Sequence, residues 1–146
     1  MKIALASDHA GWELKEAIKP FLSEHEVTDF GPEKPESMDY PDTGFSAAEA
    51  VSRGICDRAI IICGSGIGMS IVANKVKGIR AALCQTVEFA RLSRQHNNAN
   101  ALILSGRFIS SYLAKEMIDV WLSEKFLAGR HQNRLDKITE YEKSNC

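Results

Sequence analysis

The sequence has little of what marks several common classes of protein. Its 18 Lys and Arg residues nearly balance its 19 Asp and Glu residues, so the formal net charge is −1. A chain so nearly neutral does not favour nucleic acid or an anionic membrane as a partner. No apolar run approaches the roughly 18 residues that cross a bilayer. The N-terminal MKIALASDH reaches charged residues too early for a secretory signal. We therefore expect a cytoplasmic protein.

Cysteine is sparse as well, and its spacing excludes two kinds of site. The chain has four cysteines, and no two of them form a CxxC pair, which argues against a zinc ribbon and a thioredoxin-type redox site. The four histidines show no ligand spacing with one another or with the cysteines. We therefore expect neither a metal nor a cofactor. Cys56, Cys84 and Cys146 are expected to be buried or otherwise inert thiols, whereas Cys63 has a different neighbourhood.

The chain also lacks repeats, low-complexity tracts and linkers, and its 146 residues suit one domain. Short apolar runs alternate with segments of helical spacing. We predict strands at 2–7, 27–30, 59–63, 79–84 and 101–105. We predict helices at 11–24, 43–53, 66–75, 87–95, 112–126 and 132–142, and a proline-rich loop at 31–41. This alternation predicts an α/β fold, a parallel sheet with helices on both faces.

Ligands of such sheets bind beyond the carboxyl ends of the strands. The segment ICGSGIGMSIVANK places Cys63 at the end of a buried strand, followed by the alternating glycines Gly64, Gly66 and Gly68 and then by a helix. Glycines allow close backbone approach, and N–H groups at a helix N-terminus bind anions. The segment matches neither a Walker A loop, nor GxGxxG, nor a Cys-x5-Arg phosphatase loop. A tight turn without a ligand is the structural alternative.

A thiol at this place has a chemical use. Amide dipoles favour the thiolate form of a cysteine, so Cys63 is a candidate nucleophile or base. The same loop is suited to hold a developing oxyanion such as an enediolate. Ser65 adds a hydroxyl that can relay a proton between two oxygens.

Other candidates are weaker taken one at a time. Asp8 and His9 follow the first strand, where a helix N-cap is the alternative for Asp8. His96 lies in the polar run SRQHNN, where an inert loop histidine is the alternative. Arg130 and Arg134 share a helix face and suit a phosphate, although a solvated basic face has the same pattern. A further candidate on the ligand side is Arg107.

Taken together, SDHAG, DYPD, ICGSGIGMSIVANK, SRQHNNAN and GRHQNR resemble the type B ribose-5-phosphate isomerases, in that family's order and over nearly the whole chain. The resemblance implies a single-domain, Rossmann-like, three-layer α/β/α sandwich on a five-stranded parallel sheet. It also implies a place in the pentose phosphate pathway and a homodimer or dimer of dimers. The galactose-6-phosphate isomerase subunits are similar to this family but typically lack the cysteine, which disfavours them.

The resemblance also assigns roles in interconverting ribose 5-phosphate and ribulose 5-phosphate through a cis-enediolate. Cys63 becomes the carbon base, His96 and Asp8 open the sugar ring, and Ser65 stands where many members carry Thr. The substrate-binding residues it implies are Asp8, His9, Tyr40, Gly64, Ser65, Gly66, Ile67, Gly68, Asn97, Arg107, Arg130 and Arg134. Two alternatives remain: a six-carbon isomerase, acting for example on allose 6-phosphate, and a non-catalytic sugar-phosphate-binding module.

The predicted elements add a constraint on where the site is assembled. Cys63 ends the third predicted strand, whereas His96 precedes the fifth, so the two lie at opposite edges of a parallel sheet. A strand of ordinary length separates them by about 17–20 Å, which a pentose phosphate cannot bridge. We therefore expect a site shared between subunits, with the C-terminal helix, at about 131–143, packing on the partner.

Overall fold

A computed structural model describes residues 1–145, and Cys146 lies outside this range. Five strands form one sheet: β1 (Lys2–Ser7), β2 (Glu26–Asp29), β3 (Arg58–Cys63), β4 (Ala81–Leu83) and β5 (Ala101–Ser105). The helices are α1 (Trp12–Ile18), the 3₁₀ turn η1 (Lys19–Leu22), α2 (Tyr40–Ser52), α3 (Ile67–Asn74), α4 (Val87–Gln95), α5 (Ser111–Ser123) and α6 (Arg130–Asn145). No helix within residues 1–145 combines the length and the apolar character needed to cross a membrane.

The sheet is parallel throughout and has the strand order β2-β1-β3-β5-β4. The three central strands are almost entirely buried, which is why their sequences are continuous apolar runs rather than alternating ones. In the register of β3 with β5, Ala59 lies opposite Ala101 at the start and Cys63 lies opposite Ser105 at the end. Ala59 and Ala101 therefore mark the amino edge of the sheet, and Cys63 and Ser105 mark its carboxyl edge.

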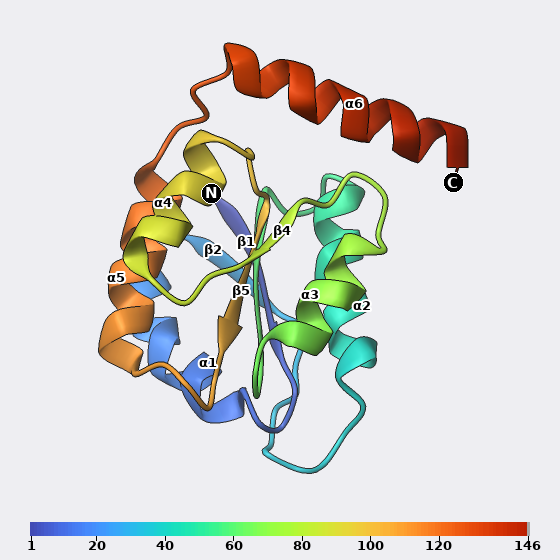
Figure 1. Cartoon of the computed structure of the whole chain (residues 1–146). Helices are drawn as coiled ribbons and strands as arrows, with labels where there is room; N and C mark the ends of the chain where they lie inside the picture. The colour runs from blue at the N-terminus through green and yellow to red at the C-terminus, as the bar shows by residue number, and fades with distance from the viewer. Residues whose placement is uncertain (146) are drawn as a thin grey trace.

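Helices cover both faces of the sheet, as predicted. One apolar core lies against α1, α4 and α5 and includes Ile3, Ile60, Leu102 and Trp121. The other lies against α2 and α3 and is built from smaller side chains, many of them alanines. Figure 1 shows the two helical layers on either side of the sheet. The three-layer α/β/α fold is thereby confirmed.

Several boundaries differ from the prediction, and three of them concern the helix at 11–24, the helix from residue 43 and the fourth strand. The helix predicted at 11–24 divides, because Pro20 lacks the N–H that an α-helix interior needs, and the chain continues as the 3₁₀ turn η1. The helix predicted from residue 43 begins at Tyr40, since a proline is tolerated in the first helical turn. The fourth strand is short and spans only Ala81–Leu83.

The last helix, α6, stands apart from the compact body. Figure 1 shows it lying across the end of the sheet where the strands begin. Leu135 is its only buried residue within the part that the structure describes, and Glu142 Oε1 accepts a hydrogen bond of 3.0 Å from Gly78 N–H. Large apolar side chains of α6, Ile138 and Tyr141, remain exposed. The helix therefore presents most of its surface away from its own subunit.

Candidate active site

The first half of the site lies at the carboxyl edge of the sheet, where β3 ends at Cys63. This residue is buried, with 4% of its surface exposed. The chain then turns through residues 64–68 into α3. Gly66 has a φ of +82°, a conformation that glycine adopts without strain. The N–H groups of Gly64, Ser65, Gly66 and Gly68 donate to no acceptor within residues 1–145. The turn therefore offers several free donors beside a buried thiol.

Asp8 and His9 reach the same edge from the end of β1. Asp8 N–H donates to Ile62 O at 3.1 Å, which ties it to β3 one residue before Cys63. The Asp8 carboxylate accepts from Gly11 N–H at 2.9 Å. Helix α1 begins only after Gly11 and has no side-chain cap, so Asp8 closes the preceding turn rather than capping the helix. The N-cap position of α1 is occupied by Gly11, whereas Asp8 makes a bond of the N-cap type three residues earlier.

Two further predicted residues lie directly on the turn. A methyl group placed on Gly68 would come within 2.7 Å of Tyr40 Cζ, so the tyrosine ring lies against this glycine. A methyl group on Gly64 would be 3.4 Å from both Cδ and Nη1 of Arg107. Arg107 N–H also donates to Gly64 O at 3.0 Å. An aromatic ring and a guanidinium thus border the free N–H groups.

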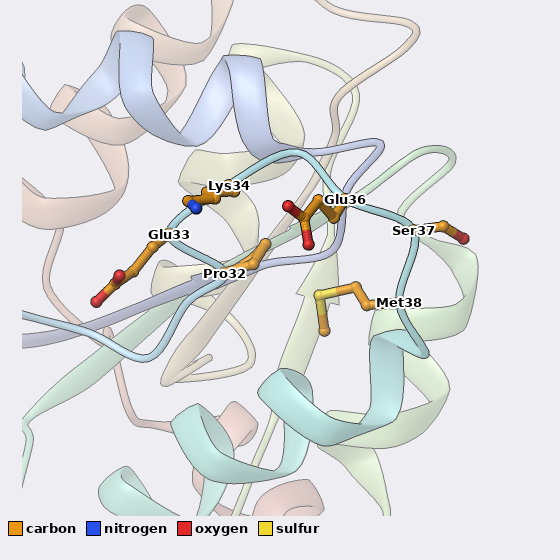
Figure 2. A pocket seen from close by; sticks show the side chains of 6 residues that line it. All are labelled: Pro32, Glu33, Lys34, Glu36, Ser37 and Met38. Atoms are coloured by element: carbon orange, nitrogen blue, oxygen red, sulfur yellow. The ribbon is translucent and has the colours of Figure 1, made fainter.

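The segment between β2 and α2 borders this edge and forms an open pocket of about 400 Å³ lined by Pro32, Glu33, Lys34, Glu36, Ser37 and Met38. Figure 2 shows Glu33 and Ser37 pointing outward in opposite directions from this segment. It joins the site through Met38, whose N–H donates to His9 Nδ1 at 3.2 Å. None of the predicted site residues lines this pocket.

The second half of the candidate site lies at the opposite edge of the sheet. His96 follows the last residue of α4, and its ring stacks on that of His131 with centroids 4.2 Å apart and planes 14° apart. Arg130 and Arg134 are exposed on the first two turns of α6. Desolvation, and then the nearby His96, Arg130 and Arg134, lower the pKa of His131 below its ordinary value. This edge therefore gathers two imidazoles and two guanidinium groups.

A buried arginine that the sequence reasoning did not single out holds the turn after His96. Arg94 Nη1 donates to Asn98 Oδ1 at 2.9 Å and to Ala99 O at 2.7 Å. Asn98 has a φ of +45°. Burial lowers the pKa of Arg94 to about 10, helped by Arg58 and Arg80, so its charge persists at neutral pH. The only signal of this contact in the sequence is the spacing of Arg94 and Asn98, which are four residues apart.

The predicted residues thus form two separate groups. Cys63, Ser65, Asp8, His9, Tyr40 and Arg107, with residues 64–68, occupy the carboxyl edge, and His96, Asn97, Arg130 and Arg134 occupy the amino edge. The four residue steps from Ala59 to Cys63 alone span about 13 Å. The opposite placement of Cys63 and His96, predicted from the sequence, is confirmed.

The remaining cysteines behave as expected where the structure describes them. Cys56 and Cys84 are buried free thiols. Burial raises the pKa of Cys84 to about 11, even though Ser93 opposes this effect, so the thiol stays protonated at neutral pH. Cys146, predicted to be inert, lies outside the described residues. Over residues 1–145, no three His, Cys, Asp or Glu side chains gather as a metal site would require.

Comparison with known proteins gives the family. A family model described as Ribose/Galactose Isomerase matches residues 3–138. The ribose-5-phosphate isomerase B of Escherichia coli K12 is 45% identical, covering 97% of this chain and 96% of its own. A solved structure of the Clostridium thermocellum ribose-5-phosphate isomerase B superposes with a TM-score of 0.97 at 51% identity, covering all of both chains.

A second solved structure carries a ligand. The ribose-5-phosphate isomerase B of Mycoplasma genitalium, solved with bound ribulose 5-phosphate, has a TM-score of 0.95 and 43% identity, covering 99% of this chain and 97% of the other. These matches extend over the whole fold, including both edges of the sheet. They confirm the resemblance drawn from the sequence motifs, and the chain therefore belongs to the Ribose/Galactose Isomerase family and is an isomerase.

Proposed function

We propose that the chain interconverts ribose 5-phosphate and ribulose 5-phosphate through a cis-enediolate. The observation that carries this proposal is the buried Cys63 thiol at the end of β3, directly beside the free N–H groups of Gly64, Ser65, Gly66 and Gly68. A base and an oxyanion site on one turn suit proton abstraction next to a carbonyl. The substrates named for the E. coli relative and the ligand of the M. genitalium relative support the choice of sugar.

In the proposed reaction the Cys63 thiolate removes the proton from C2 of the open-chain aldose. The C1 carbonyl oxygen gains the negative charge, and the N–H groups of Gly64, Gly66 and Gly68 stabilise it. The thiol then returns the proton to C1, while the Ser65 hydroxyl carries the O2 proton to O1. No proton is gained or lost overall, and the product is the ketose. Burial of Cys63 keeps water from exchanging the transferred proton.

The other predicted residues bind the sugar or open its ring. His96 and Asp8 exchange protons with the ring oxygen and the anomeric hydroxyl, and Asn97 binds sugar hydroxyls. His9, Arg107, Arg130 and Arg134 hold the phosphate, with the arginines able to bind it through paired hydrogen bonds. Tyr40 forms a wall of the site beside Gly68.

The two edges of the sheet must meet for this reaction, and we propose that they meet between two subunits. His96, Asn97, Arg130 and Arg134 of one subunit would complete the turn at Cys63 of its partner. A two-fold axis would make two such sites per dimer. Two features support this arrangement: α6 stands apart from its own subunit, and Ile138 and Tyr141 on it are exposed.

The test is turnover of two sugar phosphates by the purified chain. We expect a higher kcat/KM for ribose 5-phosphate than for allose 6-phosphate, measured as ketose formation. A preparation of Cys63→Ala made in parallel controls for contaminating isomerases. Preference for allose 6-phosphate would replace the proposed substrate by a six-carbon one. Binding of both sugars without turnover would identify a non-catalytic module and refute the proposal.

A further inference from the structure

Ser105 is a polar residue at the end of an otherwise apolar strand. It closes β5, is fully buried and lies opposite Cys63 in the register of the sheet. A buried hydroxyl needs a partner, and this one has two. Its Oγ donates to Ser65 O at 2.6 Å and accepts from Gln85 Nε2 at 2.7 Å. The contacts link the ends of β3, β4 and β5 through one hydroxyl.

The bond to Ser65 O fixes the direction of a peptide group in the turn. In a trans peptide the C=O and the following N–H point in opposite directions. Because Ser65 C=O points at Ser105, Gly66 N–H points away from Ser105, and it donates to no acceptor within residues 1–145. Gly66 has a φ of +82°, and because it has no Cβ it can also adopt the conformations that a rotated peptide would require.

The hydroxyl itself is held in one direction. Gln85 donates to Ser105 Oγ, so the Ser105 proton is directed to Ser65 O and not back to Gln85. On the other side of the turn, Ser65 Oγ accepts from Ile67 N–H at 3.2 Å. A methyl group on Gly66 would lie 3.2 Å from Ser105 Oγ, so the turn sits directly on this residue.

We propose that Ser105 is a positioning residue that holds the Ser65–Gly66 peptide with its N–H toward the reacting oxygen, and that Gln85 fixes the hydroxyl in this role. The inference rests on the proposed function. Loss of the Ser105 hydroxyl frees the peptide to turn, and a turned peptide presents Ser65 C=O to the site. A carbonyl repels an enediolate but accepts hydrogen bonds from sugar hydroxyls. Removing the hydroxyl therefore destabilises the charged enediolate more than it destabilises the bound substrate.

The experiment compares Ser105→Ala with Ser7→Ala. Ser7 is a matched control, because it is also fully buried, also ends a strand and has a hydroxyl with no hydrogen-bond partner. Removing a whole oxyanion donor typically lowers kcat by about 10²–10³-fold, so misdirecting one is expected to lower it by about 10–100-fold. We expect KM for ribose 5-phosphate to change less than about threefold in Ser105→Ala, and Ser7→Ala to keep the wild-type kcat.

Inhibitors separate a positioning role from general loosening of the fold. A phosphorylated four-carbon hydroxamate imitates the charged enediolate, whereas ribitol 5-phosphate has the hydroxyls without the charge. Ser105→Ala should bind the hydroxamate about 10–100-fold more weakly, a loss of affinity that matches its loss of kcat. Its affinity for ribitol 5-phosphate should be nearly unchanged. Gln85→Ala alters an exposed side chain and should show a smaller loss of kcat and of hydroxamate affinity. This variant replaces Ser105→Ala in the test if Ser105→Ala does not fold.

Two results would overturn the inference. One is an unchanged kcat in both Ser105→Ala and Gln85→Ala, and the other is an equal loss of affinity for the hydroxamate and for ribitol 5-phosphate. A wild-type chain that turns over no sugar phosphate would instead refute the proposed function. A wild type that is active together with an unaffected Ser105→Ala refutes only the role of Ser105. The two failures are therefore distinguishable.

Discussion

Buried cysteines in this chain differ in what surrounds them. Cys84 follows β4, donates to Ala82 O at 3.6 Å and has its pKa raised to about 11 by burial. Cys63 ends β3 and is followed by a turn with several free N–H groups. Burial alone makes a thiol inert, whereas an adjoining anion site gives a thiolate a place to act. Position in the fold, rather than residue type, separates the two.

At the residue scale we predict that Cys63→Ala abolishes aldose–ketose interconversion while the sugar phosphate still binds. Loss of a general base lowers turnover by about 10²–10⁴-fold or more, and the phosphate and hydroxyl contacts do not involve the thiol. Steady-state kinetics and calorimetric titration measure the two effects. Cys84→Ala is the matched control and should keep its activity. Near wild-type turnover in Cys63→Ala would refute the proposed base.

At the scale of elements, a buried lysine joins α1 to the end of β2. Lys15 is fully buried and donates to both carboxylate oxygens of Asp29 at 2.9 Å and to Pro32 O at 2.6 Å. Asp29 also binds Lys19 at 2.7 Å and accepts from Gly31 N–H at 2.8 Å. Burial tends to raise the pKa of Asp29, but the bonds from Lys19, Lys15 and Gly31 together lower it.

This link predicts a dependence of stability on pH. Because the folded-state pKa of Asp29 lies below the ordinary value of 3.8, its contribution is fully present above that value and is lost as pH falls through the folded pKa. At pH 6, Asp29→Asn should lower the free energy of unfolding by about 2 kcal/mol, since it leaves the fully buried Lys15 ammonium without its charged partner. Thermal unfolding should show that the difference in stability between wild type and Asp29→Asn becomes smaller below about pH 4.

The control for that prediction is Asp119→Asn, which removes an exposed pair with Lys115. Exposed pairs contribute little, so its Tm should follow that of wild type at every pH. If the difference in Tm between wild type and Asp29→Asn stays constant from pH 6 to pH 3, the Asp29 charge does not stabilise the fold.

Two arginines of helix α6 are expected to act through the affinity for the phosphate. Arg130 and Arg134 share one face of the helix, and we place both on the phosphate, a group that does not change during the reaction. Replacing either with Ala should therefore raise KM more than it lowers kcat. Lys143→Ala, on the opposite face, removes the same charge and should leave both constants near wild type. Unchanged KM with a collapsed kcat would remove the arginines from this role.

At the scale of the whole molecule, the proposal requires two subunits for one site. Cys63 and His96 lie at opposite edges of the sheet, so each inactive variant keeps the half that the other lacks. In a mixed dimer of Cys63→Ala and His96→Ala, one site has both groups and the other has neither. Random pairing makes about half of the dimers mixed, so about a quarter of wild-type activity should return.

Subunit exchange between the two variants, confirmed by mass spectrometry, is the condition for this test. Activity of each variant alone gives the baseline. If exchange is complete and no activity returns, Cys63 and His96 do not meet across a subunit interface. The shared site would then be wrong even if ribose 5-phosphate is the substrate.

The sequence alone determined most of the architecture. The central strands are continuous apolar runs, and they were predicted within one residue because burial on both faces leaves a strong signal. The short edge strand β4 was overextended, since an edge strand has fewer partners to define its ends. The positions of Cys63 and the glycine turn, and the placement of His96 at the opposite edge, could be predicted from the order of the elements along the chain and from where the motifs lie relative to them.

Contacts between residues distant in the sequence could be seen only in the folded chain. The bond from Ser105 to Ser65 O, the stack of His131 on His96 and the burial of Lys15 against Asp29 join segments that no local pattern connects. Periodicity reports which face of an element is apolar, whereas hydrogen-bond partners depend on how elements pack in space. A polar residue that ends a buried strand, such as Ser105, gains its meaning only from the neighbour that the fold brings to it.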